Sequence, residues 1–223
     1  MSEPEHDLLS IAVFVSGQGR GSNLGALIDA CVCGQIAGKI SVVVATRADA
    51  PALERAKSAG IATSVVSPRK YAGDEDGYAR VLLRILRTHD VQLICLAGYS
   101  RMLPRPVVQA YPQRIMNVHP ALLPLFGGRG MYIQHVHEAV LASGMKVSGC
   151  TVHFVDEEYD TGPIILQSTV PVLDSDTPDS LAARILPEEH RTYVRAVQLF
   201  AAGQLHVEGS RVLTSTNSKE AVL

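Results

Sequence analysis

Short apolar runs alternate with segments of helical periodicity through the first half of the chain. The apolar runs, which are typical of strands, are residues 11–16, 40–45, 61–66, 91–97 and 115–118. The helical segments between them are residues 23–33, 51–59, 77–89 and 104–111. A strand that is apolar throughout is buried on both faces. The alternation therefore predicts an α/β fold, with an open, mostly parallel, twisted sheet and helices on both of its faces.

The pattern changes in the second half of the chain. Residues 147–155 and 164–170 have the composition of two strands, with a polar turn between them. A short turn joins antiparallel neighbours, so we expect this pair as a hairpin at the edge of the sheet. Residues 205–213 indicate a smaller hairpin around Glu208-Gly209. The C-terminal half is therefore expected to add antiparallel strands to the parallel sheet.

A last helix is expected between these two hairpins, over residues 180–202. Pro187 should interrupt it, because proline cannot donate the helical hydrogen bond. The chain shows no internal repeat and no linker rich in Pro, Gly or Ser. Residues 1–223 are therefore predicted to form a single domain. Its polar ends, residues 1–10 and 214–223, are expected to be flexible tails.

Composition excludes several classes of partner. Of the 223 residues, 47% are hydrophobic and 19% are charged, so a packed core is expected. The formal net charge is −2 and no basic run is present, which argues against nucleic-acid partners. The N-terminus does not resemble a secretory signal, and no apolar stretch is long enough to span a membrane. We expect a cytoplasmic protein with small-molecule substrates, whose four cysteines (Cys31, Cys33, Cys95 and Cys150) are reduced thiols.

The histidines do not form a metal-binding motif. His135 and His137 are two residues apart, and side chains at that spacing do not share a helix face. His153 falls in a predicted strand and His190 in the last helix, and none has H-E-x-x-H spacing. No metal site is therefore expected.

A glycine-rich loop follows the first predicted strand and reads Gly17-Gln18-Gly19-Arg20-Gly21-Ser22-Asn23. Glycines leave backbone N–H groups uncovered at the start of the next helix, where an anion is favoured. Ser22 is placed to cap that helix. The loop lacks the Gly-Lys-Ser/Thr ending of Walker A, and Ser22 stands where the dinucleotide fingerprint needs its third glycine. Two interpretations stay open: a phosphate site, or a tight turn without a ligand.

Asn117 and His119 lie at the carboxyl end of the fifth predicted strand, the usual place for chemistry in a parallel sheet. Because side chains alternate along a strand, both point to the same face. Asp160 lies in the turn between the next two strands, which could fold back over this edge. These three groups supply the oxyanion donors and the proton acceptor that attack of an amine on a carbonyl requires. A histidine at a strand end is also often structural, so spacing alone leaves both roles of His119 open.

Two blocks of sequence resemble the folate-dependent formyltransferases. The first is Asn117-Val118-His119-Pro120-Ala121-Leu122-Leu123-Pro124. The second runs from Gly149-Cys150-Thr151-Val152-His153-Phe154-Val155 to Asp160-Thr161-Gly162-Pro163-Ile164-Ile165-Leu166-Gln167. With the glycine loop, the likeness extends from about residue 11 to about residue 205. It implies a Rossmann-like fold and, from the order and spacing of the blocks, an enzyme of purine biosynthesis. That enzyme would transfer the formyl group of its co-substrate 10-formyltetrahydrofolate to the amine of glycinamide ribonucleotide.

The resemblance also implies roles for individual residues. The catalytic trio of the family corresponds to Asn117, His119 and Asp160. Its folate-contacting positions correspond to Arg101, Met102, Leu103, Val155 and Asp156. Its acceptor-binding positions correspond to Gly19, Arg20, Gly21, Ser22, Asn23, Pro120 and Glu189. We expect Asp160 to pair with His119 and to raise the pKa of that imidazole, so that it donates to the oxyanion as imidazolium.

Two segments depart from the usual pattern of the family. The glycine loop is two residues longer, so the amides that would bind phosphate are not assigned individually. Residues 126–132 read Phe-Gly-Gly-Arg-Gly-Met-Tyr and are unusually rich in glycine. We expect this second segment to move and to gate the site.

Other functions are compatible with the same trio. A formyltetrahydrofolate hydrolase of this family carries an N-terminal regulatory module, and a methionyl-tRNA formyltransferase carries a C-terminal domain for tRNA. The short extensions around the predicted domain and the lack of basic charge argue against both. A non-catalytic folate- or nucleotide-binding protein of the same fold is the alternative from another class, and the presence of the whole trio argues against it. A homodimer is left open.

Overall fold

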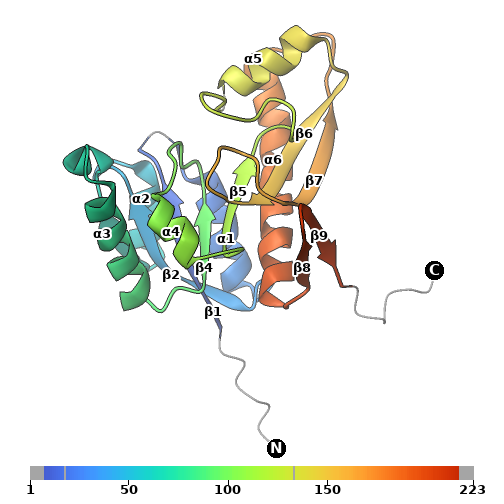
Figure 1. Ribbon diagram of the computed structural model, residues 1–223. Helices are drawn as coiled ribbons and strands as arrows, with labels where there is room; N and C mark the ends of the chain where they lie inside the picture. The colour runs from blue at the N-terminus through green and yellow to red at the C-terminus, as the bar shows by residue number, and fades with distance from the viewer. Residues whose placement is uncertain (1–7, 18, 133, 216–223) are drawn as a thin grey trace, which may run out of the picture.

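The computed structural model describes residues 8–17, 19–132 and 134–215, which form one nine-stranded sheet with helices packed against it (Figure 1). In order across the sheet, the strands are β3 (Ala62–Val65), β2 (Gly38–Ala45), β1 (Leu9–Val15), β4 (Leu93–Leu96), β5 (Ile115–His119), β6 (Val147–Phe154), β7 (Ile164–Pro171), β9 (Arg211–Thr214) and β8 (Leu205–Glu208). Strands β1 to β5 are mutually parallel, which confirms the predicted fold class. The strand order reverses between β1 and β4, and in open parallel sheets ligands bind outside the carboxyl ends of the strands at such a point.

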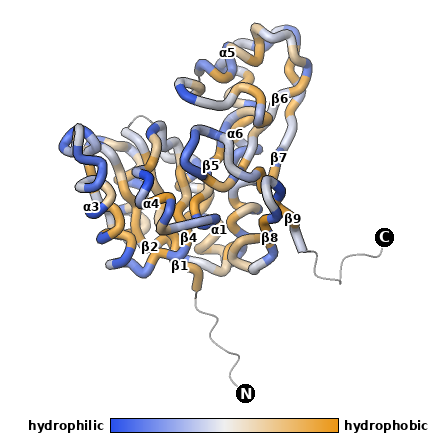
Figure 2. The backbone as a smooth tube through the Cα atoms, viewed as in Figure 1, coloured by the Kyte–Doolittle hydropathy of each residue, from blue (hydrophilic) through white to orange (hydrophobic). Residues whose placement is uncertain are grey.

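Helices cover both faces of the sheet. They are α1 (Ser22–Val32), α2 (Pro51–Ser58), the 3₁₀ turn η1 (Pro68–Tyr71), α3 (Glu75–Thr88), α4 (Arg105–Ala110), α5 (Gln134–Ser143) and α6 (Pro178–Ala201). The side chains of β1 alternate between two buried clusters. Ile11, Val13 and Val15 pack with α1, α2 and α6. Ala12 and Phe14 pack with α3 and α4 on the other face. Figure 2 shows the result, with hydrophobic residues concentrated along the central strands.

Helix α6 continues through Pro187, so the predicted interruption is wrong. A proline inside a helix costs roughly 3 kcal/mol, because one hydrogen bond is lost and the ring crowds the preceding turn. Leu181 and Ile185 before the proline, and Tyr193 and Val197 after it, are buried in one core. Each such side chain contributes about 1.5–3 kcal/mol on burial, so packing on both sides of the proline outweighs its cost.

The C-terminal half adds the expected antiparallel strands. β6 pairs antiparallel with both β5 and β7, and β8 and β9 form the small hairpin. β7 is not the edge strand that was expected, because β9 pairs with it at Ile164 and Arg211 and the sheet ends at β8. α5, which was not predicted, packs against α6. Leu9, Ser10 and Thr214 belong to strands, and most of the two predicted tails lies outside the described residues.

Candidate active site

The carboxyl end of β5 carries Asn117 and His119, and β6 runs antiparallel beside it. The register places Asn117 opposite His153 and His119 opposite Thr151. Directly opposed side chains on an antiparallel pair lie within contact distance. The hydroxyl of Thr151 donates to the carbonyl of Ala121 at 2.6 Å and so fixes the chain just after β5. The pairing of β5 with β6 therefore builds a polar group from residues far apart in the sequence.

A cavity of about 340 Å³ opens at this end of the sheet. Its wall includes the predicted trio, all five predicted folate-contacting residues and one predicted acceptor-binding residue: Asn117, His119, Asp160, Arg101, Met102, Leu103, Val155, Asp156 and Pro120. The segments that bring them together follow β4, β5 and β6. The predicted acceptor-binding residues Gly19 to Asn23 and Glu189 are not part of this wall. The structure thus collects the trio and the folate-contacting residues in one cavity.

His119 is buried and is held by two protein groups. Its Nε2 lies 2.8 Å from the carbonyl oxygen of Phe126, and its Nδ1 lies 3.7 Å from Oδ2 of Asp160. A carbonyl only accepts hydrogen bonds, so Nε2 carries the proton. Burial lowers the pKa of His119, and this effect exceeds the opposing influences of Asp160 and the Phe126 carbonyl. The expected rise in the pKa of His119 is therefore wrong, and the imidazole is neutral at pH 7.

Asp160 is ionised at the same pH. Burial acts to raise the pKa of its carboxyl, but His153, His119 and the backbone N–H of Gly128 together lower it below the ordinary value. The Gly128 N–H donates to Oδ2 at 2.9 Å, and Nε2 of His153 lies 3.6 Å from Oδ1. The backbone of Asp160 is left-handed, with φ of 57°, which a non-glycine residue adopts only where its surroundings require it. Asp160 is therefore held as a carboxylate in the cavity wall.

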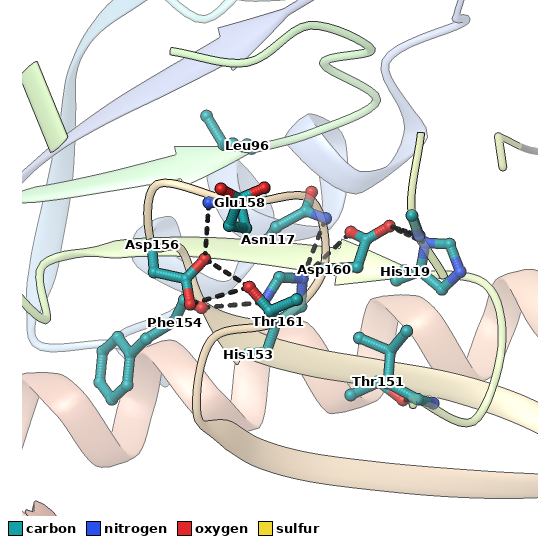
Figure 3. A network of polar contacts seen from close by, with 12 residues as sticks. Leu96, Asn117, His119, Thr151, His153, Phe154, Asp156, Glu158, Asp160 and Thr161 are labelled. Atoms are coloured by element: carbon teal, nitrogen blue, oxygen red, sulfur yellow. Dashed lines mark hydrogen bonds and ion pairs between the residues drawn. The ribbon is translucent and has the colours of Figure 1, made fainter. Parts of the chain in front are cut away.

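The turn that carries Asp160 is fixed by its own first residue. The carboxylate of Asp156 accepts hydrogen bonds from the N–H of Glu158 and from the hydroxyl of Thr161. Figure 3 shows this turn folded over the end of β5, with Asp160 between His119 and His153. A local side-chain bond of this kind is the usual way for an aspartate to start a turn.

His153 belongs to the cavity wall, although its position in a predicted strand indicated no role in the site. Its Nδ1 donates to the carbonyl oxygen of Phe154 at 2.8 Å, and its Nε2 faces both the amide of Asn117 and the carboxylate of Asp160. The amide nitrogen Nδ2 of Asn117 lies 3.3 Å from that Nε2 (Figure 3). This contact sets which end of the Asn117 amide faces His153. The second family block contains His153, but only the strand register shows its place.

The glycine loop leads into α1 with a left-handed residue. Gly21, with φ of 70°, is the N-cap. A side chain at this position would collide with Ala52, because a Cβ built on Gly21 would lie 2.8 Å from the Cβ of Ala52. Ser22 is already helical and makes no capping hydrogen bond, so the predicted Ser22 cap is wrong. Asn23 donates from Nδ2 to Glu189 at 2.8 Å. The loop is joined to the cavity wall through Ser100, whose N–H donates to Oγ of Ser16.

Two polar atoms near this loop have no hydrogen-bond partner within the described part of the chain. They are Oδ1 of Asn23 and Nε2 of His190, and both are buried. Burial raises the pKa of Glu189, against a smaller opposite effect of Asn23. Buried polar groups are usually paired, so unpaired ones at a helix N-terminus favour a polar ligand there.

Residues 8–17, 19–132 and 134–215 contain no group of three or more His, Cys, Asp or Glu side chains placed to hold a metal ion. In the same residues, no helix has the length and the apolar character needed to cross a membrane.

Comparison with known proteins places this site in a family. The family model described as formyl transferase matches residues 9–197, and the chain belongs to that family. Phosphoribosylglycinamide formyltransferase of Escherichia coli (strain K12) is 39% identical over 197 residues, which cover 88% of this chain and 89% of that protein. The chloroplastic enzyme of the same name from Arabidopsis thaliana is 46% identical over 188 residues. The match covers 84% of this chain but only 63% of the length of that relative. The crystal structure of glycinamide ribonucleotide transformylase 1 from Symbiobacterium toebii has a TM-score of 0.88 and 44% identity, and covers 95% of this chain and 96% of its own.

Proposed function

We propose that this chain transfers the formyl group of 10-formyltetrahydrofolate to the amine of glycinamide ribonucleotide, as a phosphoribosylglycinamide formyltransferase of purine biosynthesis. The products are formylglycinamide ribonucleotide and tetrahydrofolate. The observation that carries the proposal is that Asn117, His119 and Asp160 line one cavity, where His119 and Asp160 lie 3.7 Å apart and both Asn117 and Asp160 lie against His153. Relatives that cover most of this chain and carry that name support the choice of substrates.

The reaction needs donors for an oxyanion. The acceptor amine attacks the formyl carbon, and negative charge develops on the formyl oxygen. Asn117 presents one N–H of its amide to His153 and keeps the second N–H for that oxygen. A donor held in place before the reaction stabilises the charge without reorganisation. Asn117 is therefore proposed as the first oxyanion donor.

The reaction also needs a path for one proton. The attacking amine must lose it, and the leaving folate nitrogen must gain it. Asp160 is ionised and Nδ1 of the neutral His119 is unprotonated, so this pair accepts the proton from the amine. While the proton is on Nδ1, the imidazolium donates a second hydrogen bond to the oxyanion. Transfer of the same proton from the pair to the folate nitrogen completes the exchange.

The two substrates are proposed to approach from different sides. Apolar Met102, Leu103 and Val155 line the cavity and suit a flat pterin ring, with Arg101 and Asp156 beside them. For the acceptor, the backbone amides of residues 19–23 at the start of α1 suit a phosphate. Glu189, which accepts a hydrogen bond from Asn23, and Pro120, which lines the cavity next to His119, are proposed to contact the rest of the acceptor.

The test is a reaction with both substrates. The protein is mixed with 10-formyltetrahydrofolate, with and without glycinamide ribonucleotide, and deformylation is followed by absorbance. Turnover only in the presence of the acceptor supports the transferase. Equal turnover without the acceptor would make the chain a hydrolase, and no turnover in either case would favour a binding protein. The cytoplasmic location and a homodimer stay predictions, which cell fractionation and light scattering test.

A further inference from the structure

Residues 126–128 contact both titratable members of the proposed proton pair. The carbonyl of Phe126 accepts the hydrogen bond from Nε2 of His119 at 2.8 Å. The backbone N–H of Gly128 donates to Oδ2 of Asp160 at 2.9 Å. One short stretch of backbone therefore holds the imidazole with one group and the carboxylate with another.

The backbone of residues 126–128 has an unusual conformation and little free space beside it. Phe126 has φ of 55°, in the left-handed region, which persists in a non-glycine residue only where the surroundings fix it. A Cβ on Gly127 would stand 2.6 Å from Cδ2 of Leu123 and 3.1 Å from Cβ of Asp160. Contacts below 3.0 Å essentially do not occur at real Cβ atoms. A side chain at position 127 would therefore have to displace the side chain of Leu123 and would press against Cβ of Asp160, a member of the proton pair.

Each of the two hydrogen bonds has a chemical consequence. Because a carbonyl cannot donate, Phe126 keeps the resting proton of His119 on Nε2. Nδ1, which faces Asp160 at 3.7 Å, is then the nitrogen that can gain a proton. The Gly128 N–H favours the ionised carboxyl of Asp160, because its hydrogen bond to a negatively charged oxygen is stronger than one to a protonated carboxyl.

We propose that residues 126–128 are a positioning element for the reaction, here called the backbone clamp. Phe126 sets the tautomer of His119, Gly128 orients Asp160, and the missing side chain of Gly127 allows both contacts. The effect of the clamp on rate rests on the proposed function. Its effect on the tautomer of His119 is a property of the protein alone, so the two can fail separately.

The rate arm of the test uses Gly127→Ala. Displacement of a reacting group by about 1 Å can cost about 100-fold in rate, and we expect single-turnover formyl transfer to slow by about that factor with both KM values nearly unchanged. Gly144→Ala is the control, because Gly144 is also a loop glycine, with φ of 72° and no atom near its Cβ position. Leu123→Val removes the colliding Cδ2, and its addition to Gly127→Ala should restore part of the lost rate. Melting temperatures accompany each variant.

The tautomer arm uses ¹⁵N-labelled histidine and NMR, with the signals of His119 identified by their loss in His119→Asn. The wild-type protein should show His119 neutral at pH 7 with its proton on Nε2. Gly127→Ala should shift the ring toward the other tautomer, whereas Gly144→Ala should not. A wild-type ring with its proton on Nδ1 overturns the clamp, even if Gly127→Ala does not fold. A wild-type rate or a wild-type tautomer in folded Gly127→Ala also overturns it. If the wild-type protein transfers no formyl group, the proposed function fails while the tautomer comparison still decides on the clamp.

Discussion

The two ends of the proposed reaction site differ in how their polar atoms are satisfied. The trio itself is held by protein groups: His119 by Phe126, Asp160 by Gly128, and Asn117 by His153. Nδ1 of the nearby His137 is the exception, because it has no partner among the described residues. Around the glycine loop, Oδ1 of Asn23 and Nε2 of His190 are buried without a partner in the described residues. Groups that must have a set geometry or proton before reaction are fixed by the protein. The groups proposed to bind the acceptor are left with free hydrogen-bonding capacity.

This difference predicts that changes at the trio affect rate, whereas changes at the loop affect acceptor binding. The kinetic signature separates the two, because loss of an interaction made only in the transition state lowers kcat, and loss of an interaction made equally in the ground state raises KM.

The largest effect is expected at the trio. His119→Ala should lower the single-turnover rate by about 100- to 1,000-fold, the usual cost of one oxyanion donor, with both KM values nearly unchanged. Asn117→Ala and Asp160→Asn should behave alike. Because the groups act as a unit, His119→Ala/Asp160→Asn should lose much less than the product of the single losses.

The control for this series is His206→Ala, since His206 is exposed on β8 and far along the sheet from the cavity. It should keep the wild-type rate. Melting temperatures show whether His119 has a mainly structural role. A His119→Ala enzyme with more than about a tenth of the wild-type single-turnover rate contradicts the assignment, since one lost donor costs more than that.

The next effect is expected at the glycine loop. In Gly21→Val, the new side chain would meet Ala52 and would require a β-branched residue at φ of 70°. Such strain costs about 1–3 kcal/mol, so we expect the acceptor KM to rise by about 5- to 150-fold while donor binding stays nearly intact. Gly34→Val is the matched control, with φ of 75° and open space around it. It should lower stability but leave both KM values unchanged. Equal loss of folate affinity in folded Gly21→Val would sink the loop assignment.

A smaller effect is expected at Glu189, which receives the amide of Asn23. Glu189→Gln removes the charge but keeps an acceptor oxygen, and a charged partner strengthens a hydrogen bond by about 1 kcal/mol. The acceptor KM should therefore rise by roughly fivefold, with kcat nearly unchanged. Glu188→Gln is the control, because Glu188 pairs with Arg191 instead. A rise in the donor KM of the same size, or the same result in Glu188→Gln, would contradict a specific role of Glu189 in acceptor binding.

The parallel half of the fold could be predicted because the signal is local. β4 and its neighbours are apolar on both faces, and amphipathic segments such as α3 separate them. Helix α6 was misjudged at Pro187, because the local cost of proline is visible in the sequence and the buried residues on both sides of it are not. The N-cap is Gly21 and not Ser22; its left-handed φ and the nearby Ala52 of α2 leave no room for a side chain there, which the local sequence does not show.

That Asn117, His119 and Asp160 line one cavity could be predicted from family motifs, but the electrostatics of these residues could not. The pKa of His119 falls because the side chain is buried, and burial depends on the packing of β5, β6 and residues 126–128. The place of His153 depends on the register between β5 and β6, a long-range pairing that no local pattern sets. The contacts of Phe126 and Gly128 are made by the backbone, so the identity of the residues says little about them.

The smallest predicted effect concerns the carboxyl of Asp160 and can be measured without substrates. The amide proton of Gly128 donates to this carboxylate, so its chemical shift should report the titration of Asp160. Its midpoint should lie below the ordinary value of an aspartate and should be absent in Asp160→Asn. A lowered pKa in the folded state means that the unfolded state binds the proton first as pH falls. The contacts that Asp160 makes in the folded protein therefore stabilise the fold at neutral pH. That stabilisation is lost as the pH falls through the pKa of Asp160 in the folded state.

His153→Asn tests which neighbour produces this shift. Of the groups that lower the pKa of Asp160, His153 has the largest effect, so its removal should move the Gly128 midpoint to higher pH and start acid unfolding at higher pH. His206→Asn is the control and should change neither. If the midpoint in His153→Asn equals that of the wild type, His153 does not lower the pKa of Asp160. The remaining role of His153 in the site is then its contact with Asn117. The polar group around the trio would in that case consist of two independent pairs, His119 with Asp160 and Asn117 with His153, and the contrast with the glycine loop would rest on each pair separately.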